Sequence, residues 1–124
     1  MGGPARTYGL CVRHWTLAEA AAALPEVRER VQRLRELLRA RPTANGQGAR
    51  LDHEIAALIE SLQSDGIVVR DPERGLIDFP ALASSGETYL LCWLDGEDAI
   101  EWWHWPDAGF AGRTPITTPP GGPD

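Results

Sequence analysis

The sequence predicts an α+β domain in which an N-terminal antiparallel helical hairpin packs on a small antiparallel sheet. Two observations predict this fold class. Apolar residues recur at helical spacing through the first half of the chain, at Val27, Val31, Leu34 and Leu38 and again from Leu51 to Leu62. From Gly66 onward the apolar period changes to two, which is typical of strands in a meander of three or four.

A chain of 124 residues is long enough for one domain and its core. We therefore predict an N-terminal segment over 1–15 and a single domain over 16–116. The helical hairpin occupies 16–65 and the sheet with its following loop occupies 66–116. Proline and glycine dominate the end of the chain, so residues 117–124 are expected to be a disordered tail.

Composition points to a cytoplasmic protein that associates with neither membranes nor nucleic acids. Apolar runs such as Ala20–Leu24 are too short to span a bilayer, and no basic segment followed by an apolar one opens the chain. The two cysteines, Cys11 and Cys92, lack the spacing of a paired-cysteine metal motif, and a disulfide framework needs more of them. A net charge of −6 repels phosphate.

The charge is unevenly distributed along the chain. Residues 1–50 hold nine arginines against four acidic residues, whereas residues 51–124 hold three arginines against fourteen acidic residues. We expect the basic helix and the acidic remainder to attract each other, within one chain or between subunits.

The helical part has clear start and stop signals. Thr16 and Glu19 form the pattern of a capping box at the start of the first helix. Pro25 either kinks this helix or separates a short helix ending near Ala23 from a longer one, and we favour the second alternative. A second helix is predicted from Leu51 to Ser64, with Gly66 as its stop.

Four strands are predicted over residues 67–70, 76–81, 88–94 and 99–105. Asp95-Gly96 has the composition of a two-residue hairpin turn, which would set Leu94 opposite Glu97 and Leu91 opposite Ile100. One face of the ribbon would then pack on the helices, carrying Tyr89, Leu91, Trp93, Ile100 and Trp102. The other, mixed face would carry Leu90, Cys92, Glu97, Glu101, Trp103 and Trp105. Placing Ile77 and Phe79 on the helix side sends Asp78 to the mixed face, near Cys92.

Several short motifs resemble a known family. They include Gly75–Pro80, Leu91–Trp93, Trp103-His104 and Gly109–Arg113. Together they resemble an uncharacterised bacterial family catalogued as domain of unknown function 2203, over roughly residues 14–116. The resemblance implies an α+β fold and no particular activity. It also implies a set of matching positions, namely Asp78, Cys92, Trp93, Glu97, His104 and Arg113.

The candidate site residues combine ionisable groups with tryptophans. An imidazole can be a general acid, a general base or a metal ligand, so His104 is the first catalytic candidate and the metal ligand if a metal is bound. Asp78 and Glu97 are its candidate catalytic partners. Arg113 would clamp an anion, and Trp93, Trp103 and Cys92 would complete the ligand-binding site. Each also has a structural alternative: a sheet-capping histidine, a carboxylate bound to backbone amides, a solvent-exposed glutamate, an ion-paired arginine or a buried cysteine.

Strand geometry limits the combinations. Glu97 and His104 would lie about 23 Å apart on a straight strand, so they are not expected to share a metal within one subunit. His104 is expected to work with Glu87, Arg113 or Asp107 instead. Two functions remain. The first is a site for a small anionic ligand or a metal ion, with catalysis left open. The alternative is a non-catalytic interaction module, most simply a homodimer, that buries the aromatic sheet face.

Overall fold

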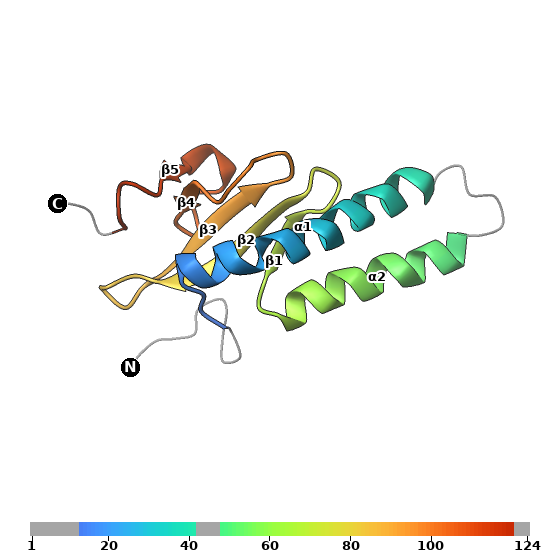
Figure 1. Ribbon diagram of the computed structural model, residues 1–124, viewed down its shortest axis with the longest axis horizontal. Coiled ribbons are helices and arrows are strands. Elements are labelled where there is room, and N and C mark those ends of the chain that lie inside the picture. Colours follow the sequence, from blue (N-terminus) through green and yellow to red (C-terminus); the bar gives the residue numbers. More distant parts are fainter. Residues whose placement is uncertain (1–12, 42–47, 121–124) are drawn as a thin grey trace.

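The computed structural model describes residues 13–41 and 48–120 and confirms the α+β fold class. Two helices precede an antiparallel meander whose strands follow one another in chain order, β1-β2-β3-β4-β5 (Figure 1). The sheet therefore has five strands where three or four were predicted. The elements are α1 (Leu17–Ala40), α2 (Gly48–Ser64), β1 (Val68–Asp71), β2 (Leu76–Leu82), β3 (Thr88–Leu94), β4 (Trp102–His104), the 3₁₀ helix η2 (Phe110–Gly112) and β5 (Thr114–Pro115).

Helix α1 begins with the predicted capping box. The Thr16 hydroxyl accepts a hydrogen bond from the Glu19 amide, and the Glu19 carboxylate accepts one from the Thr16 amide. The favoured break at Pro25 is wrong, because α1 runs through this residue without interruption. An interior proline costs about 3 kcal/mol. Leu24 and Val27, on either side of it, belong to one stripe buried on the sheet, and each buried aliphatic side chain contributes about 1.5–3 kcal/mol.

Helix α2 begins three residues before the predicted start and ends as predicted. Gly66 follows it with a φ of +84°, and the Ile67 amide donates to the Leu62 carbonyl, so the glycine supplies the left-handed residue that closes the helix. Residues 42–47, which join the two helices of the predicted hairpin, and residues 1–12 of the predicted N-terminal segment lie outside the described residues. Within the described ranges, neither helix is long and apolar enough to cross a membrane.

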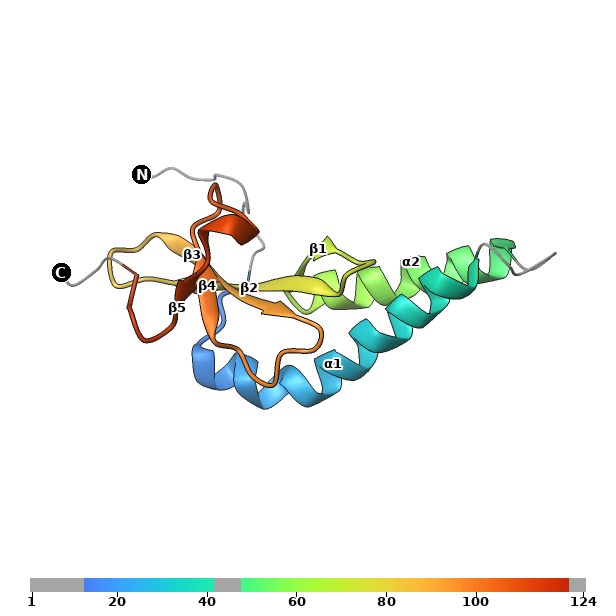
Figure 2. The same ribbon diagram turned by 90° about the horizontal axis from the view of Figure 1, so that it is seen from above.

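The expected attraction between the basic and acidic halves is confirmed within one chain. Arg30 of α1 pairs with Asp65, the residue that follows α2, over an N–O distance of 2.9 Å. Arg35 of α1 pairs with Asp95, the residue that follows β3, over 2.8 Å. Arg41 pairs with Asp52 of α2. The two helices lie beside each other and extend past the sheet at one end, while α1 crosses one sheet face at the other (Figure 2).

The pairing of β2 with β3 follows the predicted faces. Ile77 and Phe79 lie in the core against α1, and the intervening Asp78 pairs with Cys92 on the opposite face. Trp93 and Phe79 are fully buried in this core. The sheet therefore has an apolar side under α1 and a second side that carries Asp78.

The predicted register between β3 and β4 is wrong. The structure pairs Leu91 with Trp103 and Leu90 with His104, three residues away from the expected alignment. The turn itself exists, since the Glu97 amide donates to the Leu94 carbonyl over 2.9 Å and Gly96 has a φ of +109°.

After that turn the chain leaves the ladder until Trp102. Arg28 of α1 donates to the carbonyls of Glu97 and Asp98, and the Trp93 indole also donates to the Glu97 carbonyl. These bonds occupy the Glu97 and Asp98 carbonyls, and the segment pairs with β3 only from Trp102 onward. A shift by an odd number of residues exchanges the faces of a strand. Trp103 consequently enters the core, and His104 joins the face of Asp78 and Cys92.

The end of the described chain is attached to the sheet. Thr114 and Pro115 form β5 beside β4, where a loop was predicted. Thr118, in the segment predicted to be a disordered tail, accepts a hydrogen bond of 2.8 Å from the Trp103 indole. Residues 121–124 of that segment lie outside the described residues.

Candidate functional site

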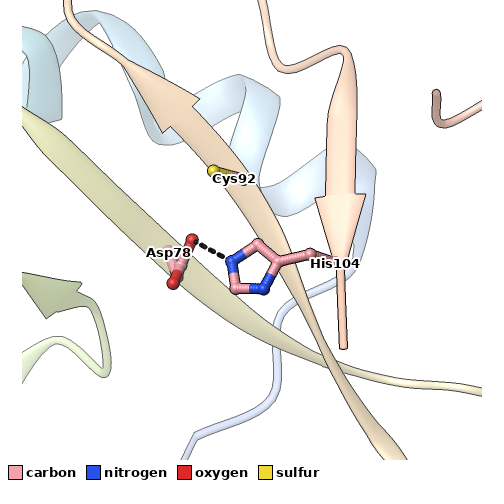
Figure 3. A group of neighbouring side chains, drawn as sticks. All are labelled: Asp78, Cys92 and His104. Carbon is pink, nitrogen blue, oxygen red and sulfur yellow. Dashed lines mark hydrogen bonds and ion pairs between the residues drawn. The ribbon is translucent and has the colours of Figure 1, made fainter. Parts of the chain in front are cut away.

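Three side chains with metal-binding or catalytic chemistry converge on the second side of the sheet (Figure 3). Asp78 comes from β2, Cys92 from β3 and His104 from β4. A carboxylate oxygen, the thiol sulfur and an imidazole nitrogen all lie within 4.8 Å of one another. The three residues are at most 2% exposed. Adjacent strands thus bring together residues that are distant in sequence, because the β2–β3 and β3–β4 registers align them.

Both ring nitrogens of His104 have acceptors as partners. Nε2 lies 3.1 Å from Asp78 Oδ1, and Nδ1 lies 2.7 Å from the Trp105 carbonyl oxygen. A carbonyl and a carboxylate can only accept, so this pattern requires protons on both nitrogens. Burial disfavours the charged ring, but the contacts with Asp78, Cys92 and the Trp105 carbonyl outweigh it and raise the pKa of His104 to about 10. The ring is therefore an imidazolium at neutral pH.

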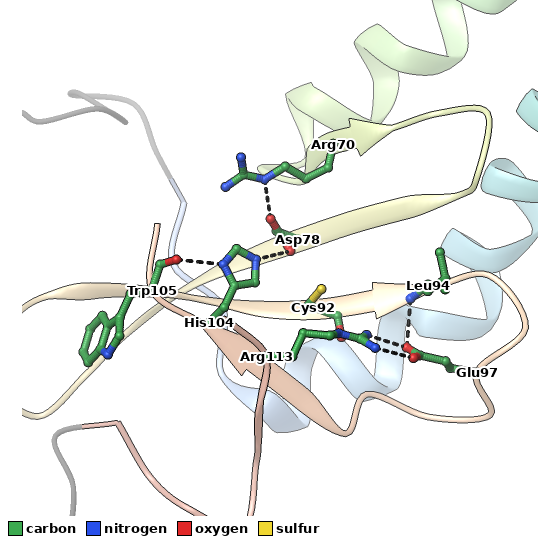
Figure 4. Close-up of polar contacts among 8 residues, drawn as sticks. All are labelled: Arg70, Asp78, Cys92, Leu94, Glu97, His104, Trp105 and Arg113. Carbon is green, nitrogen blue, oxygen red and sulfur yellow. Dashed lines mark hydrogen bonds and ion pairs between the residues drawn. The ribbon is translucent and has the colours of Figure 1, made fainter. Parts of the chain in front are cut away.

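Arg70 provides the other partner of Asp78. Its Nε donates to Asp78 Oδ2 over 2.6 Å, so the buried carboxylate lies between a guanidinium and an imidazolium (Figure 4). A buried carboxylate is tolerated only when it is paired in this way. The Arg70–Asp78–His104 ion network carries two positive charges against one negative charge.

The chemistry of the cluster fits a metal site better than a nucleophilic triad. A nucleophilic cysteine needs an accessible thiolate and a histidine free to take its proton, whereas Cys92 is buried and both His104 nitrogens are engaged. Metal-binding histidines, in contrast, usually fix one nitrogen on a backbone carbonyl and present the other to the ion. His104 has that orientation, with Nδ1 on Trp105 and Nε2 toward Asp78.

A second polar cluster lies at the turn between β3 and β4. Arg113 makes a bidentate pair with Glu97, with N–O distances of 2.7 and 2.8 Å, and Glu97 also accepts from the Leu94 amide (Figure 4). The guanidinium lies over the rings of Trp102 and Phe110. Burial alone would raise the pKa of Glu97, but the Arg113 and Leu94 hydrogen bonds hold it below its usual value. This Glu97–Arg113 pair thus occupies the guanidinium that was expected to clamp an anion.

The structure distributes the predicted site residues over three places. Asp78, Cys92 and His104 come together, and of the partners considered for His104 it is Asp78 that lies within hydrogen-bond distance of the ring. Glu97 and Arg113 form the second cluster. Trp93 and Trp103 belong to the core on the α1 side, so they support the sheet from behind.

Two partners of the site were missed by the sequence reasoning. Arg70 carried a detectable signal, because it lies in a predicted strand next to the one that holds Asp78. The Trp105 carbonyl carried none, since any residue provides a carbonyl and only the observed register brings this one to His104.

Comparison with known proteins identifies a family for the chain. A family model described as an uncharacterized conserved protein (DUF2203) matches residues 41–116. The match includes the sheet and both polar clusters, and the whole of α1 lies before it. No curated protein and no solved structure matches the chain. Because the matched segment covers more than half of its length, the chain belongs to the DUF2203 family of uncharacterized conserved proteins.

Proposed function

We propose that this protein binds a divalent metal ion of the zinc class through Asp78, Cys92 and His104. The observation that supports the proposal is the approach of a carboxylate, a thiol and an imidazole to within 4.8 Å on three neighbouring strands. Three protein ligands leave a fourth position for water or a small anionic ligand. Asp78 and His104 are thereby assigned to metal binding in place of acid–base roles.

The donor set supports the choice of ion. Thiolate and imidazole ligands favour zinc and similar transition metals, whereas magnesium and calcium prefer oxygen ligands throughout. Cys92 forms no disulfide among the described residues, so its sulfur is available as a ligand. The ligands lie on hydrogen-bonded strands, so the ion would cross-link the centre of the sheet.

Protons compete with the metal at this site. His104 must lose its Nε2 proton before that nitrogen can bind an ion, and its pKa of about 10 makes this loss unfavourable at neutral pH. Metal affinity is therefore expected to rise by about tenfold or more per pH unit between pH 6.5 and 9. Isothermal titration in buffers of different ionisation enthalpy measures the protons released.

Metal binding by matched variants tests the proposal. Zinc is titrated into the chelator-treated protein at pH 8, with circular dichroism to verify the fold. We expect one equivalent to bind, and Cys92→Ser and His104→Gln each to weaken binding at least about a hundredfold. Glu97→Gln, which removes a carboxylate from the other cluster, should bind as the unaltered protein does. A folded protein without zinc affinity, or a Cys92→Ser variant with unchanged affinity, would overturn the proposal.

A homodimer stays a second proposal, and α2 supplies the observation that favours it. Leu51, Ile55, Leu58 and Ile59 are all partly exposed on this helix. The tryptophans that were expected to form the interface are less available, since Trp93 and Trp103 are buried. Sedimentation of Ile59→Glu tests this surface: dissociation of a dimer supports it, and a monomeric unaltered protein excludes it.

The bacterial origin and cytoplasmic location stay predictions of the sequence. The small number of cysteines, too few for a disulfide framework, supports a reducing compartment. Fractionation of cells that express the tagged chain measures the location. Recovery in the cytosolic fraction is the expected result.

A further inference from the structure

We propose that Arg70 is a displaceable cation that controls metal access to the site and lowers its affinity. This inference rests on the proposed function, since it concerns the same three ligands. Arg70 is not itself a ligand in this proposal. It pairs with Asp78 Oδ2, beside the Oδ1 atom that faces His104, and its charge repels an ion bound at Oδ1 unless the side chain moves outward.

Burial singles out Arg70 as the residue on the access path. Asp78, Cys92 and His104 are at most 2% exposed, whereas the Arg70 side chain is 34% exposed. Arg70 therefore connects the buried carboxylate with the surface (Figure 4). A metal ion approaching Asp78 from this edge of the sheet meets the guanidinium first.

The position of Arg70 in β1 brings its side chain to Asp78. The register of β1 against β2 is Val68 with Asp78 and Val69 with Ile77, and then Asp71 with Leu76, so Arg70 is the extra residue of a β-bulge. A bulge redirects the side chain of its extra residue and is frequent beside functional sites. Val68 lies opposite Asp78, so the alternation of β1 already places Arg70, two residues further on, on the face of Asp78. The bulge at Arg70 and its ion pair with Asp78 are two separate features of this residue.

Charge explains how Arg70 would set affinity. In the ion network the guanidinium neutralises Asp78 together with His104. A divalent ion on Asp78 would lie close to the guanidinium and be repelled by it unless the side chain moved outward. Removing the guanidinium removes both the competitor for Asp78 and this repulsion. The site without Arg70 should therefore bind a divalent ion more tightly.

Zinc titration of three variants tests the inference. Arg70→Ala is expected to tighten zinc binding about tenfold or more, because a like charge close to the ion is lost. Arg70→Lys keeps a charge and should remain within about threefold of the unaltered protein. Arg74→Ala is the matched control, since Arg74 lies in the following turn and pairs with Asp71 instead of Asp78. It removes the same charge without removing the Asp78 contact, so it should leave affinity unchanged.

Thiol labelling gives a second readout that needs no metal. Cys11 lies outside the described residues, so the measurement uses a Cys11→Ser background in which Cys92 is the only thiol. We expect Arg70→Ala to speed alkylation of Cys92 severalfold and Arg74→Ala to leave it unchanged.

The outcomes separate the two proposals. Zinc binding by the unaltered protein that Arg70→Ala fails to tighten overturns the role of Arg70 alone. Alkylation of Cys92 at an unchanged rate in a folded Arg70→Ala variant overturns the access path. Failure of every variant to bind zinc overturns the metal site and the role of Arg70 with it.

Discussion

The Arg70–Asp78–His104 network and the Glu97–Arg113 pair lie on the same side of the sheet and are built differently. Both join a carboxylate to a guanidinium, and both contact Cys92. Asp78 and His104 of the network lie near the Cys92 thiol, whereas Arg113 of the pair donates to the Cys92 carbonyl. In the network the carboxylate is fully buried between two cations. In the pair, Glu97 is 22% exposed and faces a single cation in bidentate geometry.

This difference shows how similar ion pairs can serve different purposes. The Glu97–Arg113 pair balances its charges and adds a backbone bond from Leu94, which suits a device that fixes a turn. The network places two cations around one carboxylate, next to the Cys92 side chain. We infer that the pair is structural and that the network is the resting form of a metal site.

The largest expected effect on stability is that of Asp78→Asn. In the metal-free protein this change removes the carboxylate charge that Arg70 and the His104 imidazolium both contact. We expect the free energy of unfolding to fall by about 3–5 kcal/mol, as for other buried pairs that lose one partner. Urea denaturation with a chelator present measures it. A loss below about 1 kcal/mol would show that the network contributes no more than a surface pair.

The two clusters should respond to pH in opposite directions. The folded-state pKa of His104 is raised from 6.5 to about 10, so its contribution to stability is complete below pH 6.5 and is lost as pH rises through 10. The pKa of Glu97 is lowered, so its contribution is present above its usual pKa of 4.5 and is lost as pH falls below that value.

Unfolding measured across pH in paired variants separates these contributions. His104→Gln should flatten the alkaline decline, whose slope approaches about 1.4 kcal/mol per pH unit in the metal-free protein. Glu97→Gln should flatten part of the acidic decline only. The assignment is wrong if His104→Gln retains the full alkaline decline.

A smaller loss of stability is expected from Glu97→Gln at neutral pH. The neutral amide keeps one hydrogen bond to Arg113 and loses the charge, so the free energy of unfolding should fall by about 1 kcal/mol. Urea denaturation of Glu97→Gln and Asp78→Asn under the same conditions measures the ratio of their losses in the free energy of unfolding. An equal loss in both variants would erase the contrast between the clusters.

The smallest effect on stability is expected from Cys92→Ser in the metal-free protein. This substitution changes only the side chain, and the backbone carbonyl of residue 92 still accepts from Arg113. The free energy of unfolding should therefore change by about 1 kcal/mol or less. Zinc should stabilise the unaltered protein and leave this variant unaffected. Thermal unfolding with and without zinc checks both statements, and an equal shift in the variant would contradict them.

Local patterns predicted those parts of the fold that depend on neighbouring residues. The Thr16 capping box, the end of α2 before Gly66 and the position of Asp78 beside Cys92 each follow from a few residues and their spacing. The continuity of α1 through Pro25 was missed, because burial of Leu24 and Val27 on the sheet outweighs the local preference.

The register between β3 and β4 decides which side chains meet at the site. The Asp95-Gly96 turn suggested direct strand pairing, but Arg28 and the indole of Trp93 hold the Glu97 carbonyl and delay pairing until Trp102. Contacts with a distant helix are not visible in a local turn signal. The resulting three-residue shift moves His104 to the face of Asp78 and Cys92, so the placement of Asp78 beside Cys92 was predicted and the strand face of His104 was not.

Cobalt substitution tests the central claim most directly, because a cobalt–thiolate bond has a distinctive charge-transfer absorption in the near ultraviolet. We predict that one equivalent of Co²⁺ added to the protein at pH 8 produces this absorption. Cys92→Ser should abolish it, His104→Gln should weaken it, and Glu97→Gln should leave it intact. The absence of the band in the folded unaltered protein, or its persistence in Cys92→Ser, would contradict a metal site at Asp78, Cys92 and His104.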